Sequence, residues 1–490
     1  MATMLQIQPD AVRYSVPQAL ERFVPPAIWR RVREPAHRVL CGGRGTGKTM
    51  LLKRLSWPAM IAAPDYLPGK NFVAFYFNAR ELTDLQLLFS DVVFRENGAI
   101  LANARAICAC MGTLHLLHVI GDTLLSVPND VAGFADLSSS LIATANRVLS
   151  PILTEDFKEV AALSDFLEGK KADLIAAVGA SSRLQREAEY AQLVTPPEQT
   201  FRLFASKTRR SFDWPIGLLI DQYEWLPMQS QVIFNPLLKR ENAAHFHTVV
   251  ACLNFAFNPA LDVGSLQPGD DFAFTLAEYL PHDHDQYEAL LASIWRKLKP
   301  ECPPLDCILQ GGITFLAGSS ARSIRRFLEL VAEAGALEAT RNGEVSEGLQ
   351  RGAAERVSKA FRDELKVATG VPQGDIWNLI LAIRKLSLLP DQAEPRLLPY
   401  TISLSCQQGT AADRFSSSAT ILVKKAFEEG ALHFLNEQDI SVVTIPERFT
   451  LASILGPSLS CTFDYNRTLE LSNVRDRGGE CRTATYSKGR

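Results

Sequence analysis

The sequence predicts an α/β protein built on a parallel β-sheet, and three observations support this fold class. Several short runs of Val, Ile, Leu and Phe do not alternate with polar residues, which is typical of strands buried on both faces. A glycine-rich turn joins the first of these runs to a segment with helical spacing. A long stretch without strand character then separates the second run from the third. We therefore expect helices on both sides of the sheet and a helical insertion.

The predicted strands follow one another along the first 260 or so residues. HRVLCGG holds the first strand at 38–41, and TMLLKRL at 49–55 has the spacing of the helix that follows it. NFVAFYFNAR (71–80) is β-branched and aromatic and predicts the second strand. GLLID (217–221) and HTVVACLNF (247–255) predict the third and the fourth.

A helical insertion is predicted between the second and third strands. About 140 residues there contain many Ala, Leu and Glu, whereas a normal crossover needs only about a dozen residues. We assign 85–214 to this insertion, with a Ser-rich break near Leu137 to Ser140. Its most apolar part, AILANARAICACMGTLHLLHVIG, is interrupted by Arg105 and His115, which predicts a buried helix and no membrane span.

The chain length predicts two to four domains, since a single core rarely exceeds about 200 residues. Residues 1–274 form the predicted α/β domain, and helical hairpins are expected from Thr275 through 365. A helix followed by short strands at 366–473 resembles a winged-helix module, and 474–490 has no apolar periodicity and is expected to be a flexible tail.

Composition and charge limit the classes of partner. The net charge is −3, and residues 366–490 carry 14 Lys and Arg against 13 Asp and Glu, so no strongly basic surface for DNA is indicated and any such contact is local. Nine cysteines include no CxxC pair, and no charged-then-apolar leader precedes the first strand. We expect free thiols and a cytoplasmic protein.

The residues GGRGTGKT match the phosphate-loop pattern G-x-x-x-x-G-K-[ST]. Glycines let the backbone turn around phosphate groups, and the helix that follows presents its positive N-terminal end to them. The motif predicts ATP binding, with Lys48 at the β- and γ-phosphates and the Thr49 hydroxyl at Mg²⁺. The predicted binding residues are Gly42, Gly43, Arg44, Gly45, Thr46, Gly47, Lys48 and Thr49.

GLLIDQYEWLP supplies the second half of the predicted site. Asp221 ends an apolar run and is predicted to be a Mg²⁺ ligand together with Thr49. Gln222 can orient an attacking water but cannot accept its proton, so we expect slow hydrolysis. Glu224 can supply the carboxylate only if the strand ends at Asp221, because residues i and i+3 lie on opposite faces of a strand.

With these motifs in order, the chain resembles the AAA+ ATPases, and within them the origin-recognition-complex-like branch of bacteria and archaea. The resemblance rests on GGRGTGKTMLLKRL, LLIDQYEWL, HTVVACLN and ARSIRRFLEL, scattered over Phe23 to Leu330. It implies an αβα ATPase domain, a helical lid and a C-terminal winged-helix-like domain. The branch usually has glutamate where this chain has Gln222.

The resemblance implies further site residues. Asn254 would be the sensor at the end of the fourth strand, although a turn asparagine fits the sequence equally well. Arg325 would be the lid arginine that contacts the γ-phosphate, with Arg322 as the alternative. Arg240 is the candidate arginine finger for a neighbouring subunit, and a solvated arginine is its alternative. FVPP (23–26) would lie near the adenine.

Two other clusters of polar residues have metal-binding or phosphohydrolase-like composition. Cys108, Cys110, His115 and His118 lie on one predicted helix, where three ligands over about 15 Å cannot converge on one ion, so we expect packing residues. In PHDHDQYE, Asp283 and Asp285 fall at a predicted helix start, where acidic residues are favourable.

The leading functional prediction is an ATP-dependent AAA+ ATPase that forms homo-oligomers, binds ATP and Mg²⁺ between subunits, and organises a partner encoded nearby or a nucleic acid. One alternative is a nucleotide-stabilised scaffold with negligible turnover, such as the sensor or adaptor of an antiviral defence system. A third is a DNA-loading or transposition-type ATPase. No membrane partner is expected.

Overall fold

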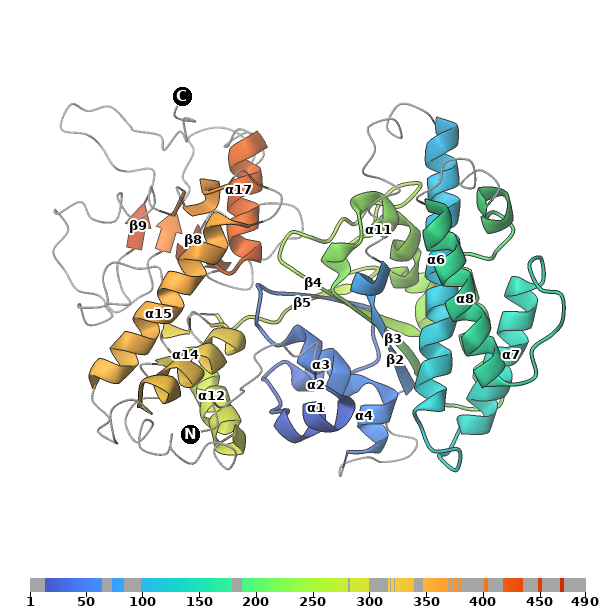
Figure 1. Ribbon diagram of the computed structural model, residues 1–490, viewed down its shortest axis with the longest axis horizontal. Coiled ribbons are helices and arrows are strands. Elements are labelled where there is room, and N and C mark those ends of the chain that lie inside the picture. The colour runs from blue at the N-terminus through green and yellow to red at the C-terminus, as the bar shows by residue number, and fades with distance from the viewer. Residues whose placement is uncertain are drawn as a thin grey trace.

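The computed structural model describes most of the chain, with gaps (Figure 1). Statements about elements and contacts below concern the described residues, which are 14–63, 73–82, 98–178, 187–280, 283–298, 316–317, 319–320, 322–338, 347–368, 371, 373–377, 379–380, 401–403, 417–434, 448–451 and 468–470. The predicted tail at 474–490 and the residues at 85–97 of the predicted insertion lie outside them.

A five-stranded parallel sheet forms the centre of the first domain, in the order β2-β3-β4-β1-β5. Its strands are β1 (Arg38–Cys41), β2 (Val73–Asn78), β3 (Ile216–Asp221), β4 (His247–Cys252) and β5 (Ala273–Leu276). This confirms the predicted α/β class with a parallel sheet. The fifth strand, β5, corrects the prediction of helical hairpins from Thr275, because Thr275 lies inside it.

Successive residues of each strand serve opposite layers, as the period of two requires. Leu40, Leu219 and Ala251 pack in one cluster with α2 and α3, whereas their neighbours Val39 and Ile220 pack in another with the helical insertion. Burial on both faces explains why these strands show no alternation in sequence. The helices of the first layer are α1 (Val16–Arg22), α2 (Trp29–Arg33), α3 (Lys48–Leu55) and α4 (Trp57–Ile61).

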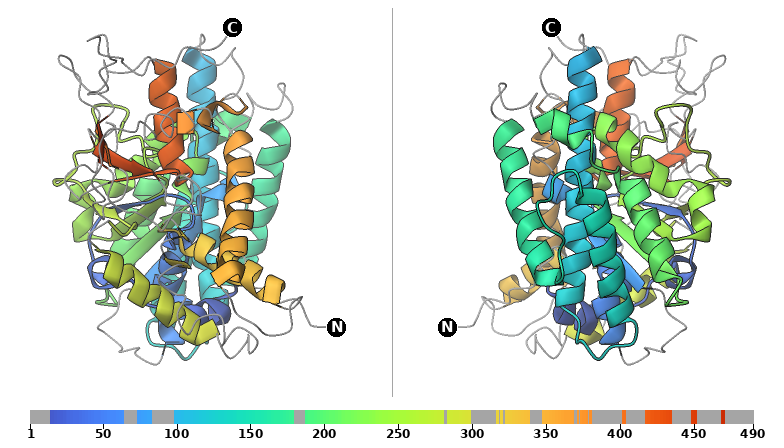
Figure 2. Two further views of the ribbon diagram at one scale, coloured as in Figure 1. Left: turned by 90° about the vertical axis from the view of Figure 1, so that its left-hand side faces the viewer. Right: turned by 90° about the vertical axis from the view of Figure 1, so that its right-hand side faces the viewer.

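The second layer is made largely by the predicted insertion, so these helices complete the αβα sandwich (Figure 2). The long helix α6 runs beside β2, with α7, α8 and α10 packed around it. Its 102–125 stretch is long and apolar enough to cross a membrane, but 72% of the 18-residue window that meets this criterion is buried inside the protein, as in a core helix. The helices are α6 (Gly98–Leu125), α7 (Phe134–Leu149), α8 (Val160–Val178) and α10 (Pro197–Thr208).

The predicted break near Leu137 to Ser140 is wrong. Both residues are buried within α7, and the chain breaks earlier, at the turn between Ser126 and Gly133. Gly133 has φ of 87° and lies against the ring of Phe212, so a glycine is required there. Serines look like loop residues in sequence, but small side chains also suit a tightly packed helix face.

A short element follows β2, and several more lie between β3 and β4. They are the 3₁₀ turns η2 (Ala79–Leu82), η4 (Tyr223–Trp225), η5 (Asn235–Leu238) and η6 (Arg240–Ala244), together with helix α11 (Met228–Phe234). Gln231 and Asn235 of this region donate to backbone carbonyls of the 256–260 loop, which fixes the connection that follows β4.

A second cluster of buried apolar side chains joins the lid to the C-terminal module. The lid helices are α12 (His284–Leu298), α14 (Ile324–Glu338) and α15 (Glu347–Lys366). In the C-terminal module, α17 (Ser417–Glu428) ends before Gly430, as expected, and precedes a small sheet in the order β7-β8-β6-β9. Its strands are β6 (Thr401–Ser403), β7 (Leu432–Phe434), β8 (Arg448–Leu451) and β9 (Thr468–Glu470).

Two histidines at the start of β1 and β4 make the stability of the sheet depend on pH. The backbone N–H of Thr248 donates to Nδ1 of His37 at 3.1 Å, so this imidazole must stay neutral to accept it. Burial, together with the smaller effect of the nearby His247, lowers the pKa of His37 to about 4. Burial also lowers the pKa of His247 to about 4.

We expect the free energy of unfolding to fall as the pH is lowered from 7.5 to 5. Because both pKa values are depressed below the unfolded value near 6.5, the unfolded chain takes up protons first, and each histidine costs roughly 2 kcal/mol at pH 5. Urea unfolding followed by tryptophan fluorescence measures the change. His247→Gln should remove about 2 kcal/mol of it, and an equal loss in the variant and the wild type would contradict this explanation.

Candidate nucleotide-binding site

The phosphate loop connects the end of β1 to the start of α3, as predicted. Gly45 and Gly47 have φ of 84° and 93°, a region that side chains with a Cβ rarely adopt. A Cβ on Gly45 would also lie 2.3 Å from Oγ of Ser323 and 2.7 Å from Cβ of Arg325, both on the lid. The glycines therefore serve two purposes: they let the loop turn and they let the lid approach its backbone.

The ammonium group of Lys48 lies inside the turn of the loop. Its Nζ donates to the carbonyl of Gly42 at 2.6 Å and to that of Gly43 at 3.0 Å. The hydroxyl of Thr46 also donates to the Gly43 carbonyl at 3.1 Å. The loop thus holds a cationic side chain in its hollow, as expected of a cradle for phosphate groups.

Asp221 is buried at the end of β3, beside the loop. Tyr76 of the neighbouring β2 donates its hydroxyl to Oδ2 at 2.7 Å, and the N–H of Gln222 donates to Oδ1 at 2.9 Å. Burial raises the pKa of the Asp221 carboxyl, while hydrogen bonds from Tyr76, Thr49 and Gln222 and the charge of Lys48 oppose the rise. Asp221 and Thr49 therefore lie together, and both offer the oxygen ligands that Mg²⁺ prefers.

The chain turns sharply after Asp221, which is the condition under which Glu224 can reach the site. β3 ends at Asp221, and Gln222 has φ of 56° and caps the short helix η4. Tyr223 points into the core, whereas Gln222 and Glu224 both line the cavity beside the loop. Burial raises the pKa of Glu224, opposed by the charge of Lys48.

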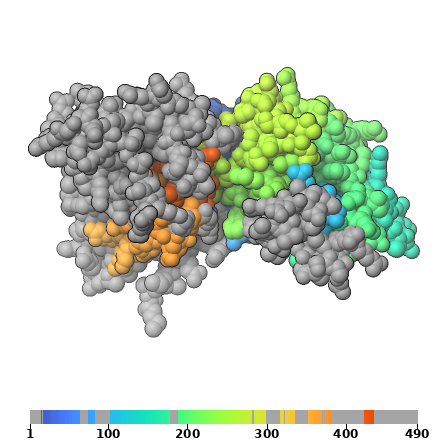
Figure 3. Space-filling model, turned by 90° about the horizontal axis from the view of Figure 1, so that it is seen from above, coloured from blue at the N-terminus to red at the C-terminus, as the bar shows by residue number. Residues whose placement is uncertain are grey.

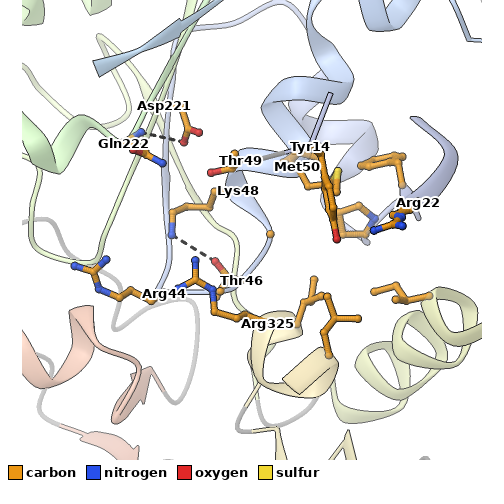
Figure 4. A pocket seen from close by; sticks show the side chains of 18 of the residues that line it. Tyr14, Arg22, Arg44, Thr46, Lys48, Thr49, Met50, Asp221, Gln222 and Arg325 are labelled. Carbon is orange, nitrogen blue, oxygen red and sulfur yellow. Dashed lines mark hydrogen bonds between the residues drawn. The ribbon is translucent and has the colours of Figure 1, made fainter. Parts of the chain in front are cut away.

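A cavity of about 400 Å³ opens beside the loop (Figure 4). The loop and the end of β3 form one end of it, and the lid helices α12 and α14 form another wall. Phe23, Val24 and Pro26 of the predicted adenine segment line it as well. Polar and aromatic side chains that the sequence does not predict also line it, among them Tyr14, Arg22, Arg80 and Trp225.

The positions of Tyr14, Arg22, Arg80 and Trp225 in the sequence give a partial signal that they lie near the site. The guanidinium carbon of Arg22 lies 4.9 Å from the centre of the Tyr14 ring, and both residues precede the predicted adenine segment in the chain. Arg80 lies just after β2 and covers the ring of Trp225 at 4.9 Å. Ligands of open α/β sheets bind at the carboxyl ends of the strands, so the residues after β2 occupy an expected position for ligand contacts, as those after β3 do.

The structure separates the three lid arginines. Arg325 lines the cavity, and its backbone N–H donates to the Gly45 carbonyl at 3.2 Å; its side chain extends toward Thr46 and Lys48 (Figure 4). Arg322 instead donates to the carbonyl of Phe434 in the C-terminal module. Arg326 is buried over the ring of Phe361. Of the two arginines considered, Arg325 is the one at the cavity.

Asn254 and Arg240 lie away from the cavity wall. Asn254 is buried in the turn after β4, and its Nδ2 donates to Oε1 of Glu278 at 2.7 Å; its neighbour Leu253 lines the cavity. Arg240 is exposed at the start of η6, and its backbone N–H donates to Asp271. Its role as an arginine finger toward another subunit therefore stays a prediction.

Among the described residues, no group of three or more His, Cys, Asp and Glu is arranged to hold a metal ion. Cys108 and Cys110 are buried in α6, where burial raises their pKa values to about 12. Burial lowers the pKa of His115 to about 3. Asp285 lies in the first turn of α12, at a helix start as expected.

Comparison with known proteins decides the family. The model of the ORC-CDC6-like family matches residues 10–298. The chain belongs to the ORC-CDC6-like family. This confirms the predicted resemblance to AAA+ ATPases of the origin-recognition-complex-like branch.

Other comparisons add little to this assignment. Among solved structures, this ORC-CDC6-like chain is similar to the Aeropyrum pernix ORC1 protein in complex with DNA, at 14% identity over 92% of each chain and a TM-score of 0.30. This likeness is too distant to indicate what the chain binds. A search of curated protein sequences found no match.

Proposed function

We propose that this ORC-CDC6-like protein binds ATP with Mg²⁺ between the phosphate loop and the lid, and hydrolyses it slowly. The observation that supports this most is the meeting of Lys48, Thr49 and Asp221 at a cavity that Phe23 and Val24 also line. Phosphates would lie against the loop, and the base against these apolar side chains. Mg²⁺, held by Thr49 and Asp221, would neutralise charge that develops on the phosphates.

In this proposal Glu224 accepts the proton of the attacking water. Its raised pKa suits a general base better than that of an exposed carboxylate, because transfer is most efficient when the pKa approaches the working pH. Gln222, beside it on the cavity wall, orients the same water through its amide. Arg325 contacts the γ-phosphate from the lid, which ties closure of α14 to the presence of the nucleotide.

We further propose that the protein assembles with copies of itself and uses its ATP state to organise a partner protein or a nucleic acid. Arg240 supports the assembly step, because it is exposed and does not line the cavity of its own subunit. The scaffold alternative, with negligible turnover, keeps support from Gln222, which replaces the expected glutamate. Both readings share the same ATP site and differ in the rate of hydrolysis.

The rate of phosphate release from ATP tests whether this site hydrolyses the nucleotide. Asp221→Ala should reduce release to the background rate, because the Mg²⁺ ligand is lost, whereas Asp262→Ala on the surface should leave it unchanged. Identical rates in Asp221→Ala and wild type would show that the activity arises elsewhere. Nucleotide extracted from the purified protein separates the alternatives: ADP supports the ATPase, and intact ATP supports the scaffold.

A further inference from the structure

A buried carboxylate outside the cavity connects the phosphate loop to the C-terminal module. Oε1 of Glu278, in the loop after β5, accepts the N–H of Gly43 and the Nδ2–H of Asn254. Its Oε2 lies 3.0 Å from Nδ1 of His433 on β7. The side chains of Glu278 and His433 are only 1% and 5% exposed. One carboxylate therefore joins three segments that lie far apart in the sequence.

An aromatic cluster also connects the turn after β4 to the C-terminal module. Phe255, which follows Asn254, has φ of 61°, a strained conformation for a bulky residue. Its ring packs against Phe427 at 5.4 Å and Phe434 at 5.8 Å, both from the C-terminal module. Such strain persists only where the surroundings hold the residue in place. The C-terminal module thus determines the shape of the turn that carries Asn254.

Polar contacts extend this interface along the phosphate loop. The N–H of Arg44 donates to the carbonyl of Glu428 at 3.1 Å, and its Nε lies 2.9 Å from the carboxylate of Glu429. Arg326 of the lid donates to the Glu429 carbonyl at 3.2 Å. The end of α17 therefore touches both the loop and the lid; Figure 3 shows it beside the first domain.

The chemistry of Glu278 also orients the amide of Asn254. The lowered pKa of Glu278, caused by His433, Gly43 and Asn254 against the effect of burial, keeps it an ionised, purely accepting group. Asn254 must then turn its nitrogen toward Glu278, which leaves Oδ1 as the end available to other partners. Oδ1 is buried and has no protein partner among the described residues.

We propose that Glu278 and His433 are positioning residues for ATP hydrolysis. Docking of 417–434 places His433 against Glu278, and Glu278 then fixes both Gly43 of the phosphate loop and the Asn254–Phe255 turn. The C-terminal module thereby supports hydrolysis within the same chain, and a partner that displaces it slows turnover. This inference rests on the proposed ATPase function, but its structural half can be tested without nucleotide.

Amide hydrogen exchange on the nucleotide-free full-length protein tests the structural part of the proposal, that Glu278 and His433 hold Gly43 in place. In Glu278→Ala and His433→Ala, amide exchange in the peptide that contains Gly43 should accelerate about tenfold or more, because the acceptor is lost or released. His118→Ala is the matched control, since it removes a histidine 2.7 Å from a carboxylate, that of Asp122, in the insertion. Unchanged exchange at Gly43 in both test variants would overturn the proposal.

The rate of ATP turnover tests the second part of the proposal, that Glu278 and His433 support hydrolysis. His433→Ala should lower kcat about fivefold or more, while His433→Gln, whose amide can still donate to Glu278, should recover most of the rate. A merely structural loss would not be rescued in this way and would appear equally in His118→Ala. A kcat that is unchanged or raised in His433→Ala would contradict a supporting role. If wild type neither binds nor hydrolyses ATP, the proposed function fails, whatever the exchange result.

Discussion

Replacing Lys48 with alanine should weaken ATP binding by on the order of 100-fold, the largest effect expected of any single change in the loop. Lys48 is the cationic side chain inside the hollow of the loop, where its Nζ already bonds two backbone carbonyls. Near a polyphosphate, the same group would form charge-assisted hydrogen bonds, which are stronger than neutral ones. Fluorescence titration with a labelled ATP analogue measures the loss.

The control for this prediction is another lysine whose ammonium is bonded elsewhere. Lys170 pairs with Asp173 on the exposed side of α8, so Lys170→Ala should leave ATP affinity within about twofold of the wild type. Thermal unfolding of both variants verifies that neither change disrupts the fold. If Lys48→Ala binds the analogue as tightly as Lys170→Ala, the loop does not hold the phosphates.

Glu224→Gln should lower turnover by roughly 100-fold or more while leaving ATP affinity nearly unchanged. The substitution keeps the shape of the side chain but removes the base that accepts a proton from water. Gln222→Ala should cost less than about tenfold, because an orienting amide is easier to replace by water than a base. Single-turnover phosphate release, measured after mixing with excess protein, separates chemistry from product release.

The pH dependence of turnover provides a second test of the role of Glu224. Since burial raises the pKa of Glu224, its basic form is lost as the pH falls, and wild-type turnover should fall on the acid side. The Glu224→Gln variant should show a flatter profile over the same range. If neither substitution changes the rate, hydrolysis is not the function of this turn, and the scaffold alternative is favoured.

Much of the site could be predicted because its signals are local. The phosphate loop needs a strand, glycines, a lysine and a helix within a few residues, and each appears in order at 38–55. The tight turn after Asp221, on which the placement of Glu224 depends, is present, because Gln222 adopts a left-handed conformation. Such patterns survive in sequence because one short segment carries all their chemistry.

Features that depend on distant pairs could not be predicted. Tyr76 reaches Asp221 only because β2 and β3 pair in parallel register, and nothing in NFVAFYFNAR indicates it. β5 is only four residues long and lies where the sequence changes to helical spacing, so the sequence predicts helices from Thr275 instead of a strand. The contact between Glu278 and His433 joins residues 155 positions apart. Only the folded chain brings such groups together.

Equilibrium titration of the wild-type protein with ATP, with and without Mg²⁺, shows whether this cavity is an ATP·Mg²⁺ site. We expect one ATP per chain, bound more tightly with Mg²⁺ than without, and a loss of this Mg²⁺ effect in Asp221→Ala. Absence of saturable ATP binding, or a Mg²⁺ effect that persists unchanged in Asp221→Ala, would show that it is not.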